Sequence, residues 1–203
     1  MVTTDPNAAP RRRVELAGHI GAAGFASGDR VVVGAWTSGP LGSMIDVMWA
    51  RPDGERVLLA PTEWVAAFIA SVYRFDRSEV VAVRGFCDGR RLEVDAGPLS
   101  IRMVAGRGWS LPPASLRPAW WTRFVEGPIA RVSMGVRTYG VTPTGVREWY
   151  RADRWRPVLT GSATLDDVDL GAIGPVDPPC RFGFSEPPNR PSITRVRPLL
   201  EFP

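Results

Sequence analysis

The alternation of apolar and polar residues along the chain predicts mostly β structure. Residues 43–51 (SMIDVMWAR) alternate between two faces, and a second apolar run follows at 55–61 (ERVLLAP). Asp53 and Gly54 lie between the two runs. An Asp-Gly pair in this position is a strong hairpin signal, so the pattern predicts an antiparallel hairpin over residues 43–60.

Residues 62–73 (TEWVAAFIASVY) have the pattern of the one convincing helix. Thr62 can act as the N-cap, and Glu63 complements the positive end of the helix dipole. A stripe at helical spacing, typical of core packing, is formed by Trp64, Val65, Phe68, Ile69 and Val72. We therefore expect this helix to lie against the sheet.

The rest of the chain adds further strand signals, with Asp88-Gly89 as a second hairpin turn and Pro157 as the mark of an edge or a bulge. These strands are expected at 30–36, 79–87, 90–96, 98–106, 128–141, 146–159 and 192–200. A short second helix is expected near 118–125. The predicted fold class is α+β, mostly β: a curved antiparallel sheet or barrel of about eight or nine strands with the helix 62–73 packed on it.

The chain is expected to form a single domain over residues 14–203. Residues 1–13 predict a flexible basic arm that ends in Arg11, Arg12 and Arg13. Residues 160–192 are rich in Gly, Asp and Pro and show little periodicity. A stretch of this length within one domain carries function or wraps the core, so we expect a Pro-rich C-terminal wrap.

The composition removes several kinds of chemistry. The 25 basic residues are all arginine, because the sequence contains no lysine. Schiff-base enzymes, P-loop proteins and kinase-type sites need a lysine and are excluded. His19 is the single histidine, which excludes histidine-based metal sites, and we expect no metal and no cofactor. An enzyme is not favoured, because Asp46, Glu148 and Glu186 form no pair with a defined catalytic spacing.

Cysteine usage indicates a cytoplasmic protein. Cys87 and Cys180 lie far apart without a metal-binding spacing, so we expect two free thiols in a reducing compartment. No apolar run is long enough to span a membrane. The formal net charge is +4 and the isoelectric point about 9.8, but 21 acidic residues are spread among the arginines. The net positive charge is therefore only a weak argument for nucleic-acid binding.

Two stretches resemble known sequences: GPLGSMIDVMWARPDGERVLLAP (39–61) and RFGFSEPPNRPSITRV (181–196). They are similar to uncharacterised conserved proteins of high-GC Gram-positive bacteria, a resemblance that implies no activity. The strand count also fits the acetoacetate-decarboxylase-like barrels. Their chemistry needs a lysine, which this chain lacks, so that resemblance would extend only to the architecture.

Asp46 is the most prominent candidate for ligand binding. It shares one strand face with Met44 and Met48, while Ile45, Val47 and Trp49 share the other. If the second face packs on the helix, Asp46 would face a cavity, where a carboxylate has a raised pKa. The alternatives are an Asp that faces solvent or one that is paired with an arginine.

The segment 181–190 (RFGFSEPPNR) is a candidate lid over a pocket. Phe182 and Phe184 would point inward, and Glu186 or Arg190 would meet the ligand. The alternative is a Pro-rich wrap that holds two aromatic rings against the core.

The run 147–156 (REWYRADRWR) interleaves arginines with aromatic residues, as stacking surfaces for nucleic acid do. The same pattern is also typical of cation–π packing on an exposed strand. Glu148 and Asp153 interrupt the basic charge, so we expect weak, non-specific binding at most. The nucleic-acid candidates are Arg11, Arg12, Arg13, Arg151 and Arg154.

These observations favour a cytoplasmic β-barrel-like domain that binds a small apolar or amphipathic molecule. The second hypothesis is a non-catalytic protein-interaction module, for which a homodimer is one form. The third is a weak nucleic-acid-binding module. A membrane partner is not expected.

Overall fold

The computed structural model of the chain describes residues 12–110 and 139–203. Three expectations therefore fall wholly or partly outside the described residues: the basic arm up to Arg11, the short second helix near 118–125, and the strand over 128–138. The described part is mostly β structure, with one helix.

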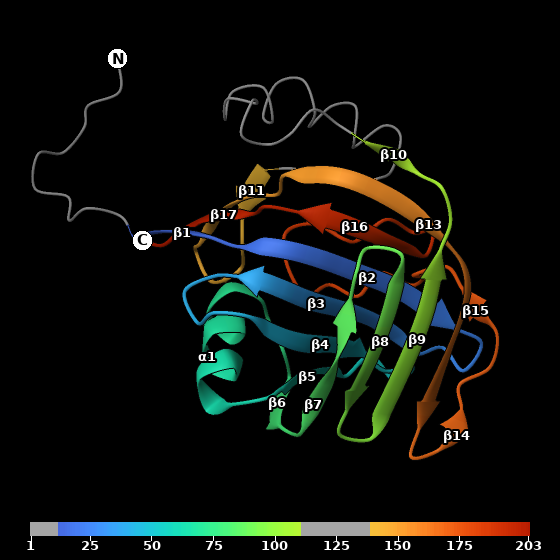
Figure 1. The fold of residues 1–203 in the computed structure, drawn as a ribbon. Helices are drawn as coiled ribbons and strands as arrows, with labels where there is room; N and C mark the ends of the chain where they lie inside the picture. Colours follow the sequence, from blue (N-terminus) through green and yellow to red (C-terminus); the bar gives the residue numbers. More distant parts are fainter. Residues whose placement is uncertain (1–11, 111–138) are drawn as a thin grey trace, which may run out of the picture.

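A curled sheet dominates the structure (Figure 1). Its strands in spatial order are β6 (Arg77–Val80), β5 (Arg56–Ala60), β4 (Met44–Ala50), β3 (Arg30–Ser38), β2 (Ala17–Phe25), β16 (Ser192–Val196), β13 (Ala152–Leu165), β9 (Leu99–Ala105), β8 (Arg91–Ala96) and β7 (Val83–Cys87). Neighbours pair antiparallel, apart from the parallel pair β5–β6. This path has more strands than the sequence pattern predicted.

Short strands extend this frame. At the margins of the curled sheet, β10 (Trp109–Ser110) and β14 (Val168–Asp169) pair with β13, and β15 (Ile173–Gly174) pairs with β2. A separate four-stranded sheet has the order β1 (Arg13–Glu15), β17 (Leu199–Glu201), β12 (Arg147–Trp149) and β11 (Tyr139–Val141). Arg13, expected in the flexible arm, therefore begins a strand.

The curled sheet has a hydrophobic core on each of its two faces. Strands β8 and β9 cross over β2 to β5 on the inner face, where Val47 and Trp49 are buried (Figure 1). The helix α1 (Glu63–Val72) covers the outer face, where Met44 and Met48 are buried. The expected assignment of the two faces of β4 was therefore reversed. Both faces are buried and apolar, so alternation shows which residues share a face but not what covers it.

The helix begins as the sequence predicted. The hydroxyl of Thr62 accepts a hydrogen bond from the backbone N–H of Val65 at 3.2 Å, as expected of an N-cap. The buried stripe is Val65, Ala66, Ile69 and Val72. Trp64 was expected in this stripe but is 78% exposed, because it lies one residue before the stripe and its ring points to solvent.

The hairpin over residues 43–60 is confirmed. β4 and β5 pair antiparallel, and Gly54 takes φ +93°, which suits glycine in the turn. The strand expected over 79–87 is instead two strands, because β6 pairs with β5 while β7 pairs with β8. The hairpin around Asp88-Gly89 is present as β7 and β8.

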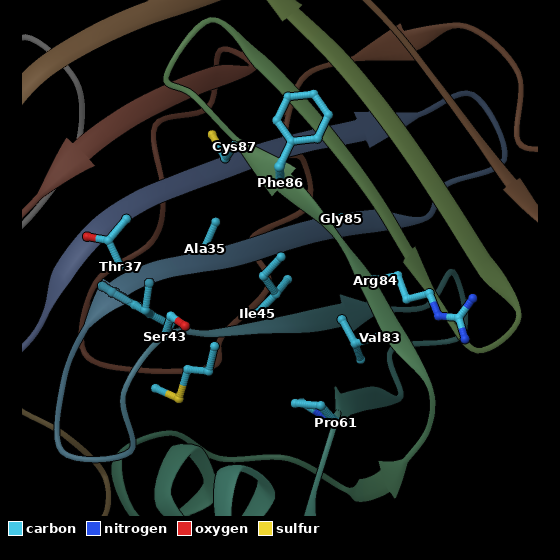
Figure 2. A pocket seen from close by; sticks show the side chains of 12 residues that line it. Ala35, Thr37, Ser43, Ile45, Pro61, Val83, Arg84, Gly85, Phe86 and Cys87 are labelled. Carbon is cyan, nitrogen blue, oxygen red and sulfur yellow. The ribbon is translucent and has the colours of Figure 1, made fainter.

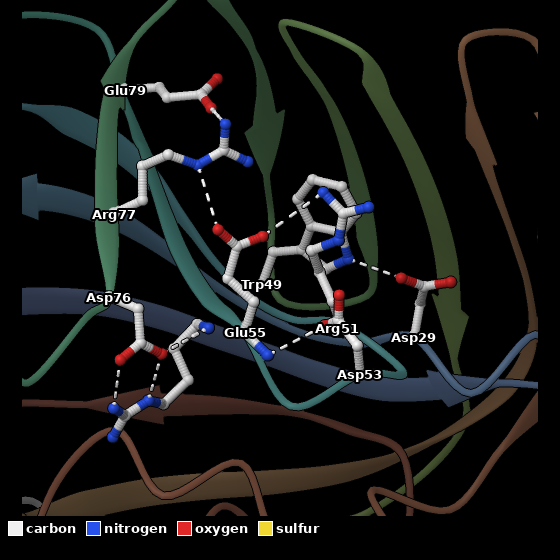
Figure 3. Close-up of polar contacts among 9 residues, drawn as sticks. Asp29, Trp49, Arg51, Asp53, Glu55, Asp76, Arg77 and Glu79 are labelled. Atoms are coloured by element: carbon white, nitrogen blue, oxygen red, sulfur yellow. Dashed lines mark hydrogen bonds and ion pairs between the residues drawn. The ribbon is translucent and has the colours of Figure 1, made fainter.

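Polar contacts tie the β4–β5 hairpin to β6 and to the β2–β3 turn (Figure 3). The Trp49 indole N–H donates to the buried Asp29 carboxylate at 2.7 Å. The ion pairs around the hairpin are Arg51–Glu55 at 3.4 Å, Arg77–Glu55 at 3.4 Å, Arg77–Glu79 at 2.7 Å and Arg56–Asp76 at 2.7 Å. Most of these side chains are half-exposed, so the pairs orient β6 more than they stabilise it.

The long strand β13 joins the two halves of the curled sheet. Residues 152–157 pair with β16, and residues 158–165 pair with β9. The register shifts directly after Pro157, between Val158 and Thr160. The expected wrap over 160–192 is thus partly strand: β13 runs to Leu165, and β14 and β15 follow, whereas residues 175–191 have neither helix nor strand.

Candidate functional site

A small cavity lies on the outer face of the curled sheet, beneath residues 182–188. Its volume is about 70 Å³. The floor is formed by Ile20, Val32 and Met48 from the sheet, the sides by Tyr73, Glu148 and Tyr150, and the cover by residues 182–188. The walls are therefore largely apolar or aromatic, with the carboxyl residues Glu148 and Glu186 among them.

Glu148 is the carboxyl residue in the side wall of this cavity. It lies in the middle of β12 and is 2% exposed. The Tyr73 hydroxyl donates to the two carboxylate oxygens at 3.0 and 3.2 Å. Burial raises the pKa of Glu148 from 4.5 to about 7, although the Tyr73 hydrogen bond acts in the opposite direction. Protonated and ionised forms are therefore both populated near neutral pH.

Two tyrosines complete the polar part of the cavity. Burial raises the pKa of Tyr73 well above its ordinary value, and the nearby carboxyls of Glu148 and Asp46 raise it further. Burial also raises the pKa of Tyr150, whose hydroxyl is hydrogen-bonded to Thr194. Both phenols are hence neutral hydrogen-bonding groups at neutral pH.

Asp46 lies next to this cavity, within β4, and is fully buried. Its Oδ1 accepts a hydrogen bond from the Trp36 indole N–H at 2.8 Å, while Oδ2 has no hydrogen-bond partner among the described residues. Burial raises the pKa of Asp46 from 3.8 to about 7. The two alternatives, a solvent-facing Asp and an Arg-paired Asp, are both wrong.

Gly34 makes room for this buried hydrogen bond. It pairs with Asp46 across β3 and β4. A Cβ atom on Gly34 would lie 2.5 Å from both Asp46 Oδ1 and Trp36 Nε1. The Trp36–Asp46 hydrogen bond therefore requires glycine at position 34.

The predicted cover segment fits closely over the cavity. Phe182 is buried in the outer core, and the ring of Phe184 packs against Gly140. A Cβ atom on Gly183 would lie 2.8 Å from the Tyr73 ring. Such contacts leave no space for side chains at these glycines, so the segment rests directly on the aromatic wall.

The remaining predicted ligand residues have other roles. Glu186 borders the cavity, but its two oxygens accept hydrogen bonds from the backbone N–H groups of Cys180 at 2.8 Å and Arg181 at 2.9 Å. It therefore holds the cover segment in shape. Arg190 is exposed and does not border the cavity. Met48 borders the cavity, and Met44 borders a different cleft. Asp46 borders neither of them.

That second cleft lies on the inner side, between β7 and the neighbouring strands β3 and β4 (Figure 2). Its volume is about 760 Å³. Most of the residues that border it are apolar, and those on its inner side are Ala35, Ile45, Pro61, Val83 and Phe86. Thr37, Ser43 and Arg84 add polar groups at its border.

The predicted nucleic-acid residues are not brought together. Arg13 is ion-paired with Glu201 at 2.9 Å in the small sheet, and Arg154 lies in β13 of the curled sheet. Arg151 is half-buried just before β13, Arg12 is exposed, and Arg11 is outside the described residues.

Sequence reasoning missed Glu148 and Tyr73 as site residues. Glu148 was considered as an acid that interrupts a basic run and as one of three acids that form no pair with a defined catalytic spacing. Its alternation with Val146 and Tyr150, two large hydrophobic side chains on the same strand face, was the available signal. Tyr73 carried no signal, because it meets Glu148 only through the packing of α1 against the small sheet.

Comparison with known proteins identifies no family for this chain. No family model matches the chain, and no curated protein matches it. Two solved structures are similar at 12% and 10% identity: an acetoacetate decarboxylase (TM-score 0.42, covering 94% of this chain and 84% of that one) and the acetoacetate decarboxylase of Legionella pneumophila (TM-score 0.38, covering 96% and 86%).

Two features are absent from the described residues. No group of three or more His, Cys, Asp or Glu side chains there is placed to hold a metal ion. No helix in the same residues has the length and apolar character needed to cross a membrane.

Proposed function

We propose that the chain is a small-molecule-binding domain whose ligand occupies the cavity beneath residues 182–188. The observation that carries this proposal is the position of Glu148, a buried carboxyl group in a largely apolar and aromatic enclosure. A few convergent polar groups in an apolar cavity are the usual composition of a ligand site. The volume of about 70 Å³ suits a molecule of only a few heavy atoms.

The ligand carries a hydrogen-bond donor. Among the described residues, Glu148 has two acceptor oxygens but only the Tyr73 hydroxyl as a donor, and the nearby Asp46 retains one oxygen without a partner. Acceptors are therefore in excess over donors in this region. A short-chain amine or alcohol would supply the missing donor and place its alkyl part on the apolar floor.

Binding of 1-butanol and n-butylamine, followed by NMR chemical-shift changes, tests this proposal. Butylamine should bind more tightly as the pH rises through about 7, because Glu148 then ionises. Glu148→Gln should abolish this pH dependence. Glu201→Gln is the matched control, since Glu201 is also buried in the small sheet but pairs with Arg13 and Arg147. Equal binding by both variants and wild type would refute the proposal.

A second candidate function at the same site is proton transfer. It is favoured by the pKa of about 7 for Glu148, because an acid–base group works best with a pKa near the working pH. Solvent deuterium exchange at the α-carbon of 2-butanone, followed by NMR, provides the assay. Exchange above the buffer rate that Glu148→Gln removes supports this function, and exchange at the buffer rate rejects it.

A further inference from the structure

A row of basic side chains crosses the inner face of the curled sheet, on the side opposite to the cavity. Arg154 in β13 pairs with Arg195 in β16, and Arg195 pairs with His19 in β2. Residues paired directly across antiparallel strands lie on the same face, so two guanidinium groups and an imidazole are neighbours. All three side chains border a hollow of about 160 Å³.

The charge around this hollow is unbalanced. Arg156 also borders it, and Arg90 lies near enough to lower the pKa of Arg156. Of the residues that the structure describes, Asp88 is the one acidic residue that borders the hollow. Within residues 12–110 and 139–203, no ion pair joins any of these arginines to a carboxylate.

Asp88 is already engaged in the turn that carries it. Its Oδ1 accepts hydrogen bonds from the backbone N–H groups of Arg90 and Arg91, each at 2.7 Å. These bonds hold the β7–β8 turn over the hollow. One carboxylate cannot neutralise several guanidinium groups, so an excess of positive charge remains.

Like charges placed directly across an antiparallel pair destabilise a sheet. Elsewhere in the structure arginines form ion pairs with acids, as Arg56 does with Asp76 and Arg102 with Asp95. The Arg154–Arg195 pair instead places two like charges next to each other at the border of the hollow. An anion bound in the hollow would offset the repulsion.

His19 adds a neutral hydrogen-bonding group to this hollow. Burial lowers its pKa, and the neighbouring charge of Arg195 lowers it further. Its Nδ1 is buried and has no hydrogen-bond partner among the described residues. The other ring nitrogen faces Gly89, where a Cβ atom would lie 2.9 Å away. The turn therefore closes directly over the imidazole.

The hollow adjoins the large apolar cleft. His19 pairs with Ala35, which borders the cleft, and Cys87 of the cleft directly precedes Asp88 of the hollow. The cleft continues from there over Ile45 and Phe86 (Figure 2). Charged and apolar binding surfaces are thus contiguous.

We infer that this inner surface binds a small amphipathic oxyanion, with its carboxylate or phosphate group among Arg154, Arg156 and Arg195 and its apolar part in the cleft. Guanidinium groups match both oxyanions by paired N–H donors. The apolar side chains of the cleft match an alkyl or aromatic chain. This inference does not depend on the proposed function of the cavity on the outer face.

Calorimetric titration with four probes tests the inference: inorganic phosphate, decanoate, decyl phosphate and decanol. Decanoate or decyl phosphate should bind at least tenfold more tightly than decanol and than inorganic phosphate. The two amphiphiles distinguish a carboxylate site from a phosphate site. Binding should weaken as salt is added, because the guanidinium groups are partly exposed.

Arg195→Gln should weaken binding of the preferred amphiphile by about tenfold to a hundredfold, the value of a charge-assisted hydrogen bond. Without ligand, the same variant should melt at the wild-type temperature or above, because its repulsion with Arg154 is gone. Arg154→Gln provides a second variant if the first does not fold. Arg102→Gln, which removes a partner of Asp95, is the matched control and should bind as wild type does.

Phe86→Ala separates the two halves of the site. It should weaken the amphiphile and leave inorganic phosphate binding unchanged. Wild-type affinity in Arg195→Gln, or equal affinity for decanol and decanoate, would overturn the inference. Tight binding of a single-stranded oligonucleotide that excludes the amphiphile would overturn it as well, in favour of a nucleic-acid surface.

Discussion

Gly34 and Asp46 lie directly opposite each other on β3 and β4, and the absent side chain of the first leaves space for the carboxylate of the second. That carboxylate is fully buried, and the Trp36 indole is its hydrogen-bond donor. Backbone pairing, a missing Cβ and a buried charge-bearing group are therefore combined at one position of the sheet.

Gly34→Ala should destabilise the fold by about 1–3 kcal/mol, the usual effect of an overpacked core. The new methyl group would lie 2.5 Å from Asp46 Oδ1 and would displace the Trp36–Asp46 contact. Urea unfolding measures the effect. Gly174→Ala is the control, because nothing lies within 4 Å of a Cβ atom there, and it should be nearly neutral. Equal effects for both variants would show that the contact has no such role.

Stability should fall as the pH rises from about 4 to about 7. The pKa of Asp46 is 3.8 in the unfolded chain and about 7 in the fold, so the folded state alone holds the proton in this range. The contribution of Asp46 to stability is fully present below pH 3.8, its pKa in the unfolded chain. It is lost as the pH rises to about 7, its pKa in the folded protein. Glu148 contributes in the same direction.

Asp46→Asn keeps an acceptor for Trp36 and should remove the Asp46 share of this loss, on the order of 4 kcal/mol. Chemical unfolding at pH 4 and pH 8 gives the measurement. Asp76→Asn is the control, since the pKa of Asp76 is lowered to about 2 by the Arg56 hydrogen bond. It should leave the loss between pH 4 and 7 in place. A wild-type slope in Asp46→Asn would contradict the assignment.

Trp49→Phe should destabilise the protein by about 1–3 kcal/mol, because the buried Asp29 carboxylate then loses a donor at 2.7 Å. Trp64→Phe serves as the control, since Trp64 is 78% exposed and should tolerate the change. Thermal melts of the two variants make the comparison. Similar melting temperatures for both would mean that the Asp29 contact contributes nothing.

Iodoacetamide should label the folded protein slowly at pH 8. Burial raises the pKa of Cys180 to about 12 and that of Cys87 to about 11, so little thiolate is present at either position. Both cysteines are free, as the sequence predicted, and two equivalents should react after unfolding in guanidinium. Rapid labelling of the native protein would indicate an accessible thiolate.

Local signals predicted the elements well. The Asp53-Gly54 turn and the Thr62 N-cap depend only on near neighbours in the chain, and both appear in the structure. The faces of β4 were not predictable in the same way, since Met48 and Val47 are equally apolar and each is buried. Only the packing of α1 and of β8 and β9 decides which face is which.

The sites depend on pairings that a single sequence does not display. Arg154 was selected as a candidate, but its neighbour Arg195 was not, because their contact arises from the register between β13 and β16. Glu148 in the small sheet and Tyr73 at the end of α1 likewise meet only through the packing of distant parts of the chain. Chemistry that arises from long-range pairing leaves no local signature in the residues that perform it.

The pairing of β2 with β16 places an early strand beside one of the last in the chain. On the ribosome, β2 to β5 therefore emerge long before residues 192–196. Until then, the edge of β2 that pairs with β16 stays unpaired. An unpaired strand edge is a template for association with other chains. Contacts this distant in sequence also slow folding. We expect newly made chains to need protection from self-association until synthesis has passed residue 196.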